Sequence, residues 1–298
     1  MKKIFASIGF ISLLLSVLLQ SYSVHGNNQE QFETLFSKAL LANQQNEDLS
    51  VVSRLLAAAL EIDPDNPKAN WQLLWLHTQL WTNNKQLNLR ATQLAYIAPE
   101  INKIIEGARQ RGDIAFSHYV MARYSGSYNQ FDIALEEIEK SLEIEPESAL
   151  YLFVKADLLS DRGSWEWEKR NHWLEESIPV LLQTLTLIEK KPSLYITQSA
   201  VYFALAQNNS FLKDGDPQES IEYYLKSLKS DDGGMQPEFS WNNISIAYRK
   251  SGQCNKAQEA AEKALEIKKF GAARTNRRYA IFCQKMVELG ITNSDDTP

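Results

Sequence analysis

The feature that most constrains the fold is a pattern of about 34 residues that returns along the chain. Each copy has an apolar segment, a turn and an alanine-centred segment, with apolar residues three and four positions apart. The closing residues show it best in Ala59–Pro64 (ALEIDP), Ser141–Pro146 (SLEIEP) and Ala264–Lys269 (ALEIKK). This period is typical of a helix-turn-helix unit that buries its apolar face against copies of itself.

The clearest copy occupies 238–269. It carries apolar and small residues at regular places: Trp241, Ile244, Ser245, Tyr248, Gly252, Ala257, Ala261, Ala264, Leu265 and Ile267. These residues resemble the tetratricopeptide repeat, Trp-x2-Leu-Gly-x2-Tyr followed by alanines and a closing proline. The resemblance implies an all-α fold, a right-handed α-α superhelix (solenoid) of about six repeats with a C-terminal capping helix. The repeats are expected at 33–67, 68–101, 115–148, 149–192, 193–232 and 238–270, the cap at 271–290 and a disordered tail at 291–298.

Three departures from even spacing predict specialised segments. We expect an additional helix at Glu100–Gln110 after a helix closed by Pro99, a second helix lengthened by Ser164–Trp173 before Pro179 bends it, and an insert at Asn208–Gly215. Gly163 and Gly252 are expected to end first helices. Insertions in a solenoid collect in loops on one face, where they often bind ligands.

The N-terminus predicts export. Lys2 and Lys3 precede the uncharged apolar run Ile4–Leu19, and small residues follow before residue 26. We interpret 1–26 as a secretory signal peptide of bacterial style, with the solenoid at 27–290 in the periplasm or secreted and no stable membrane insertion after cleavage. The alternative is an uncleaved N-terminal anchor, although the run is short for a spanning helix.

Charge favours some partners over others. The chain has a formal net charge of −6 and no nucleic-acid-binding motif, which argues against nucleic acid as a partner. Basic residues nevertheless outnumber acidic ones between Lys250 and Lys285. This segment is either a basic surface for an acidic partner, an anionic glycan or headgroups, or a capping helix with a solvated polar face.

The two cysteines, Cys254 and Cys283, have no neighbouring His or Cys that would suggest a zinc site. If their two helices run antiparallel, the thiols face one another, and an oxidising compartment would let them form a disulfide. The alternative is a pair of buried free thiols. No metal and no cofactor is expected, because stacked repeats can bury a continuous core without one.

Catalytic patterns are missing from the sequence. The four histidines are scattered, and neither a nucleophile elbow, a zinc-protease motif, a phosphate loop nor a dinucleotide fingerprint is present. We therefore expect a protein that is not an enzyme.

The resemblance also implies an inner groove. In the family, certain first-helix positions line the concave surface, and their asparagine and basic residues hold peptide backbone or carboxylates. Carried over, the positions are Gln72, Leu76, Gln79, Tyr119, Arg123, Phe153, Asp157, Asn242, Asn243, Arg249 and Lys250. We expect no packing role for Asn242, Asn243 and Arg249; the alternative is that the whole set is merely a soluble inner face. The family's full carboxylate-clamping set is not reproduced.

These observations lead to two hypotheses of function. The first is a non-catalytic scaffold or adaptor in the bacterial periplasm or envelope that holds another protein, an envelope protein or an exported chain, in its groove. The second is a glycan- or cell-wall-binding accessory protein of an envelope assembly or secretion system. Trp165, Trp167 and Trp173 suggest it, because exposed aromatic faces on a loop stack on sugars.

Overall fold

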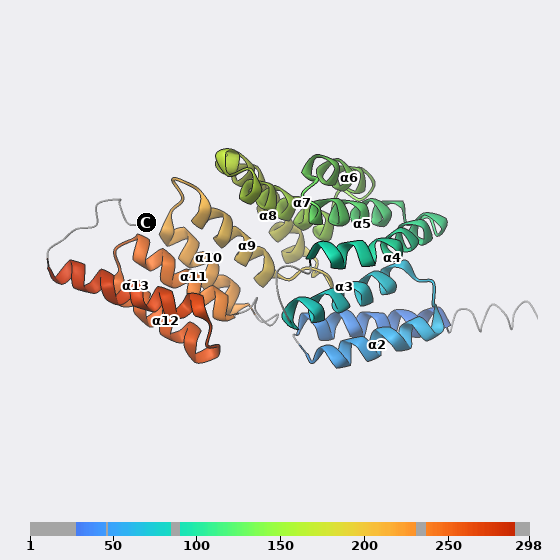
Figure 1. Ribbon diagram of the computed structural model, residues 1–298. Helices are drawn as coiled ribbons and strands as arrows, with labels where there is room; N and C mark the ends of the chain where they lie inside the picture. The colour runs from blue at the N-terminus through green and yellow to red at the C-terminus, as the bar shows by residue number, and fades with distance from the viewer. Residues whose placement is uncertain (1–27, 46, 85–89, 231–236, 290–298) are drawn as a thin grey trace, which may run out of the picture. The chain divides into compact units, whose positions relative to one another are not determined.

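The computed structural model describes residues 28–45, 47–84, 90–230 and 237–289, without the side chains between 78 and 97 (Figure 1). The predicted signal peptide at 1–26 and the predicted tail at 291–298 lie outside these residues. The chain divides into two compact units, one ending at Asp113 and the other beginning at Ile114.

Unit 1 consists of two helix pairs. Its helices are 28–44, α2 (Leu49–Ile62), α3 (Pro67–Asn84) and α4 (Arg90–Gln110). Unit 2 continues the alternation of helix and short connection to the C-terminal helix. Its helices are α5 (Ile114–Ser127), α6 (Phe131–Ile144), α7 (Ala149–Trp165), the short 3₁₀ helix η2 (Trp167–Lys169), α8 (Arg170–Lys190), α9 (Gln198–Phe211), α10 (Pro217–Lys229), α11 (Pro237–Lys250), α12 (Cys254–Ile267) and α13 (Gly271–Glu288). The described residues contain no strand, so the expected all-α class is confirmed.

The core of unit 1 forms between its first three helices. Phe32, Phe36 and Leu56 are buried together, because the apolar residues of 28–44 and α2 recur once per turn. Asn66 caps α3 by accepting the backbone N–H groups of Lys68 and Ala69, each at 3.1 Å, as its sequence position before Pro67 predicts.

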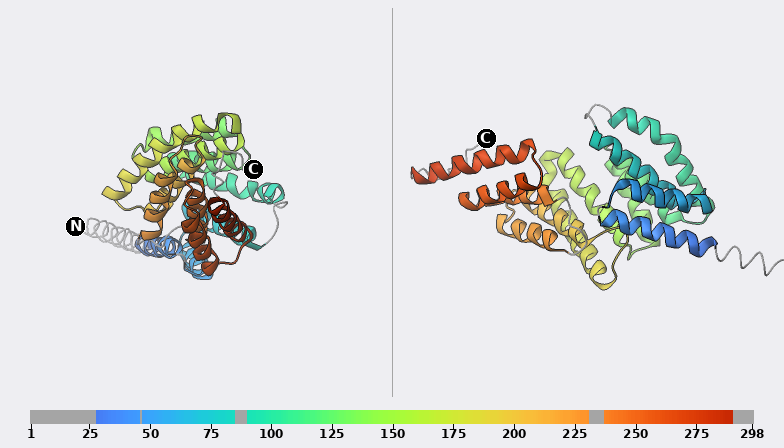
Figure 2. Two further views of the ribbon diagram at one scale, coloured as in Figure 1. Left: turned by 90° about the vertical axis from the view of Figure 1, so that its left-hand side faces the viewer. Right: turned by 90° about the horizontal axis from the view of Figure 1, so that it is seen from below.

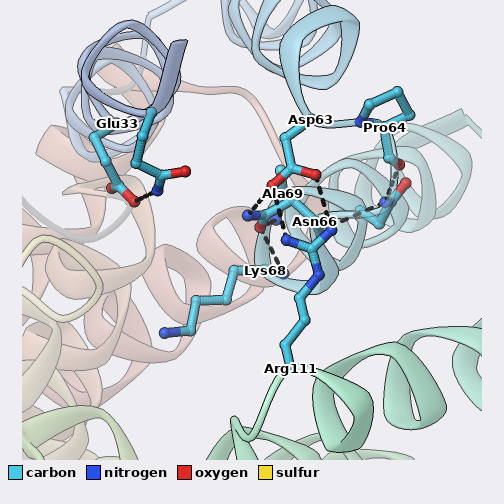
Figure 3. A network of polar contacts seen from close by, with 9 residues as sticks. Glu33, Asp63, Pro64, Asn66, Lys68, Ala69 and Arg111 are labelled. Carbon is cyan, nitrogen blue, oxygen red and sulfur yellow. Dashed lines mark hydrogen bonds and ion pairs between the residues drawn. The ribbon is translucent and has the colours of Figure 1, made fainter. Parts of the chain in front are cut away.

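A charged pair ties the two helix pairs of unit 1 together (Figure 3). The Arg111 guanidinium donates two hydrogen bonds of 2.8 Å to the Asp63 carboxylate. Asp63 follows α2 and Arg111 follows α4, so the contact joins the ends of both second helices. The hydrogen bond from Arg111 lowers the pKa of the Asp63 carboxyl below its usual value.

Two helix ends that the sequence predicted are not present. The helix α4 continues through Pro99, so the expectation of a separate helix at Glu100–Gln110 is wrong. Gly163 lies inside α7 and does not end it. A Cβ at residue 163 would lie 3.3 Å from both the Arg170 carbonyl oxygen and the Trp173 Cβ, so this glycine lets α8 approach α7 closely. Gly252 does end α11, with a φ of 73° that favours glycine.

A buried polar cluster fixes how three helices of unit 2 meet. Ser160 of α7, Ser177 of α8 and Asn208 of α9 are joined by hydrogen bonds of 2.9 to 3.1 Å. Because each group would be costly to bury without a partner, the cluster specifies one register for α7, α8 and α9. Asn208 lies in α9, so the predicted insert at Asn208–Gly215 is too long. The connection between α9 and α10 consists of residues 212–216.

None of the helices in the described part of the chain combines the length and apolar character needed to cross a membrane.

Candidate partner-binding surface

In unit 1, the expected groove positions separate into different environments. Leu76 is buried in the core with Phe32 and Leu56, so its assignment to the groove is wrong: the position packs against the neighbouring pair. Gln72 is half-buried and lines a small hollow beside Trp75. Gln79 lies on α3, but its side chain is outside the described residues.

The positions on α5 and α7 contact one another. Arg123 forms an ion pair with Asp157, which links the first helices of two successive repeats. Tyr119 is buried, and its ring stacks on Tyr151 with centroids 5.6 Å apart. Phe153 is half-buried against the core of α7, α8 and α9. Tyr119 and Phe153 therefore serve mainly in packing, contrary to the expectation of a free inner face.

On α11, one of three polar residues proves to be structural. Asn242 is only 6% exposed, and its Oδ1 accepts a hydrogen bond of 2.8 Å from Asn276 Nδ2 on α13. The expectation that packing has no use for Asn242 is wrong, because α13 packs over this part of α11 and pairs the amide. Arg249 also faces α13, with its guanidinium 5.5 Å from the centre of the Tyr279 ring.

Asn243 and Lys250 border a pocket of about 110 Å³ between α9, α10 and α11. Asn243 Nδ2 donates a 3.1 Å hydrogen bond to the Tyr224 hydroxyl, and Lys250 Nζ donates a 2.9 Å hydrogen bond to the Ser210 carbonyl oxygen. The exposed ring of Phe211 also lines this pocket, which we call the α11 pocket.

The α11 pocket combines apolar walls with a cation at its mouth. Burial, and to a lesser degree the neighbouring Arg249 charge, lowers the pKa of the Lys250 ammonium. A carboxylate or carbonyl oxygen placed beside Lys250 would relieve this cost, while Phe211 and Ile246 offer apolar contact. Sequence reasoning found Asn243 and Lys250 but missed Phe211 and Tyr224. The spacing of Tyr224 predicted core packing, and Phe211 was expected only as part of the insert at Asn208–Gly215.

A second charged cluster lies between α5 and α6. His118 Nδ1 lies 2.7 Å from Glu137 Oε2, and Lys140 Nζ lies 2.7 Å from Glu137 Oε1. Burial raises the pKa of the Glu137 carboxyl, but the hydrogen bonds from His118 and Lys140 outweigh burial, and the pKa lies below its usual value. Because the folded-state pKa is lowered, ionised Glu137 stabilises the fold above its unfolded-state pKa.

We therefore expect Glu137→Gln to lower the free energy of unfolding at pH 7 by about 1–3 kcal/mol. The difference from the parent should shrink as pH falls from about 5 toward 2, where the carboxyl is protonated in both states. Urea unfolding across this range measures it. Glu143→Gln, on the exposed side of α6, is the control; equal effects of both variants would contradict a special role for Glu137.

Trp165 and Trp167 are 65% and 71% exposed at the junction of α7 and η2. Trp173 differs, since the Arg162 guanidinium lies 4.0 Å from the centre of its ring and its Nε1 donates to Glu166 Oε2. The connection between α9 and α10 meets the same end of α8, where Lys213 N donates to Asn171 Oδ1 at 3.1 Å. The connection between α7 and α8 and the connection between α9 and α10 therefore lie together at this end of α8.

Cys254 and Cys283 are joined as a disulfide, with Cα atoms 5.6 Å apart, at the packed contact of α12 with α13. This geometry agrees with the predicted pairing. Among the described residues there is no group of three or more His, Cys, Asp or Glu side chains that could hold a metal ion.

Comparison with known proteins supports the same class of fold. A family model described as tetratricopeptide repeat matches residues 240–270. The solved structure of yeast Tom70 is 13% identical and superimposes with a TM-score of 0.54, covering 86% of this chain and 47% of that one, so this chain spans about half its length. The P58(IPK) TPR domain is 15% identical over 86% of this chain and 80% of its own, with a TM-score of only 0.34. No curated protein matches the chain significantly.

The consecutive packed helix pairs define an all-α repeat protein. More particularly, the chain carries a tetratricopeptide repeat at 240–270 and has the tetratricopeptide-repeat fold.

Proposed function

We propose that the protein is a non-catalytic adaptor, exported from a bacterial cytoplasm to the periplasm or envelope, which holds a segment of a partner protein at the α11 pocket. The observation that carries the proposal is the pocket itself, where Asn243 and Lys250 meet the exposed ring of Phe211. It offers a hydrogen-bonding cation beside apolar walls, which suits a short peptide segment with an acidic or carbonyl group next to an apolar side chain.

Two features support a location outside the cytoplasm. The apolar run Ile4–Leu19 behind Lys2 and Lys3 has the pattern of a secretory signal. The Cys254–Cys283 pair suits an oxidising compartment, because disulfides persist there and are rare in the cytosol.

The α11 pocket predicts how capture of a partner depends on charge. In affinity purification from envelope extract, Arg249→Glu/Lys250→Glu should weaken capture of a specific protein by about tenfold or more, because the cation at the pocket mouth is reversed. Circular dichroism and thermal unfolding will show that the variant folds. Lys190→Glu/Lys191→Glu makes the same charge change at the exposed end of α8. Equal capture by both variants would contradict the proposal.

The glycan-binding hypothesis gains one observation, the high exposure of both Trp165 and Trp167. Exposed indole rings on a connection can stack on sugar faces, whereas buried rings cannot. A glycan or cell-wall contact at this junction is therefore our second candidate function.

Fluorescence quenching separates the two functions. Trp165→Phe/Trp167→Phe should remove mainly acrylamide-quenchable emission, since both rings are exposed to water. Trp173→Phe is the control, because its ring is held by Arg162 and Glu166. If soluble cell-wall glycan protects the parent but not the double variant, the glycan candidate gains support. If it protects neither, that candidate is excluded and the adaptor remains.

A further inference from the structure

The outward side of α13 carries an unusual combination of residues. From its exposed residues we define the terminal face as three basic and three apolar or aromatic ones: Arg274, Arg278, Tyr279, Phe282, Lys285 and Leu289, which directly follows the helix. Thr275, Val287 and the acidic Glu288 are also exposed on α13. Ala273, Ala280 and Cys283 occupy the opposite, buried side. α13 is thus an amphipathic helix whose outer side is itself part apolar and part basic.

The cations of the terminal face have no acidic partner in the described part of the chain. None of Arg274, Arg278 and Lys285 lies within 4.0 Å of a described carboxylate. By contrast, Arg277 lies 2.9 Å from Glu262, and Lys268 lies 3.4 Å from Glu238. The first turn of α13 also holds no acidic residue, so the charge of Arg274 is opposed by the helix dipole. Ion pairing therefore accounts for none of the three cations, and the helix dipole favours only Lys285, which lies in the last turn of α13.

The apolar side chains of the terminal face are large and accessible. Tyr279, Phe282 and Leu289 are 50%, 52% and 72% exposed. A helix that only closes a repeat array needs a polar outer side. The terminal face does not meet that description, and contiguous exposed aromatic and aliphatic side chains typically mark an interaction site.

The packing of unit 2 indicates what shape would cover this face. Successive helices pack against each other from α5 to α13, and α13 contacts α11 and α12 (Figure 2). Phe282 and Leu289 are seven residues apart, with Arg278 and Lys285 at the same spacing beside them. Residues at these intervals form a straight stripe along a helix, which is the surface that another amphipathic helix covers.

We propose that the terminal face binds an acidic amphipathic helix of a partner protein. Its apolar residues would cover Tyr279, Phe282 and Leu289, and its carboxylates would face Arg274, Arg278 and Lys285. Charge complementarity selects this occupant, since two terminal faces would bring like charges together. This surface shares no lining residue with the α11 pocket, although the Arg249 guanidinium lies 5.5 Å from the Tyr279 ring, and the proposal does not depend on the function proposed for that pocket.

A designed peptide provides the probe. It has the 18-residue length of α13, leucines along one side and glutamates beside them, and carries fluorescein; a second peptide has lysine at every glutamate position. Fluorescence anisotropy with the whole protein should show binding of the glutamate peptide that is about tenfold or more tighter than that of the lysine peptide and weakens with salt.

Variants locate the contact. Arg274→Glu/Arg278→Glu/Lys285→Glu should weaken binding of the glutamate peptide by about tenfold or more. The matched control is Lys190→Glu/Lys191→Glu/Lys229→Glu, which reverses three exposed lysines at the end of α8 and on α10 and should bind as the parent does. Phe282→Ala keeps the charge and should still weaken binding several-fold, which tests the apolar part even if the triple variant does not fold.

Four outcomes would overturn the proposal. Equal binding of both peptides, or unchanged binding by the terminal-face variants, would show that this surface does not select an acidic helix. Binding to phosphatidylserine vesicles that the triple variant loses, without peptide binding, would assign the face to a lipid surface. A parent that sediments as a dimer, with monomeric Phe282→Ala, would assign it to a second copy of the chain.

Discussion

Replacing Cys254 and Cys283 with serine will lower the free energy of unfolding by about 3–4 kcal/mol. The bridge closes a sequence separation of 29 residues, and a crosslink of this length removes about that much chain entropy from the unfolded state. Both residues are buried where α12 packs on α13, so their replacement also loosens the end of the array that carries the terminal face.

Thermal unfolding of the oxidised parent and of the double variant, with and without reductant, measures this loss. Reductant should destabilise the parent to the level of the variant and leave the variant unchanged. Mass spectrometry of unreduced protein after alkylation supplies the independent check. If both thiols are alkylated without reduction in exported material, the disulfide is not part of the working protein.

Tyr224→Ala should lower the free energy of unfolding by about 3–5 kcal/mol. Tyr224 is among the largest fully buried side chains, and its ring packs edge-on against Phe203 at 5.6 Å between centroids. Its loss leaves a cavity beneath the α11 pocket. Burial raises the pKa of the Tyr224 hydroxyl to about 12, so the side chain stays neutral near physiological pH.

Tyr224→Phe separates packing from hydrogen bonding. It keeps the ring and removes only the hydroxyl that accepts from Asn243, so it should cost about 1 kcal/mol. Urea unfolding of both variants decides the point. Similar losses in the two would mean that the Asn243 contact, and not the packed ring, holds this part of the pocket.

The repeat architecture could be predicted because the same pattern recurs several times, so an unusual residue in one copy changes the prediction little. The segments ending in Pro64 and Pro146 each predict a helix pair, and each pair is present with a short connection. Single residues were less informative. Pro99 predicted a helix end but lies within α4. Gly163 predicted a helix end too, but it lies within α7 and allows α8 to pack closely.

The candidate site was predictable only in part. A family position shows which side of a helix faces inward, but not whether another helix covers it. Asn242 has a favourable groove position and is nevertheless paired with Asn276, because α13 lies against it. Asn243 and Lys250 do line a pocket, but its other wall is formed by Ser210 and Phe211 at the end of α9. Such contacts join residues far apart in the sequence, so spacing alone could not predict them.

The most direct test of the adaptor proposal is site-specific photo-crosslinking in the native host. A photoreactive amino acid replaces Ile246, which lines the α11 pocket, or Glu259, which is exposed on α12. We predict a discrete crosslinked protein from position 246, reduced by Arg249→Glu/Lys250→Glu, and none from position 259. A crosslinked product from position 259 alone, or one from 246 that the charge reversal leaves unchanged, would contradict binding of a partner at this pocket.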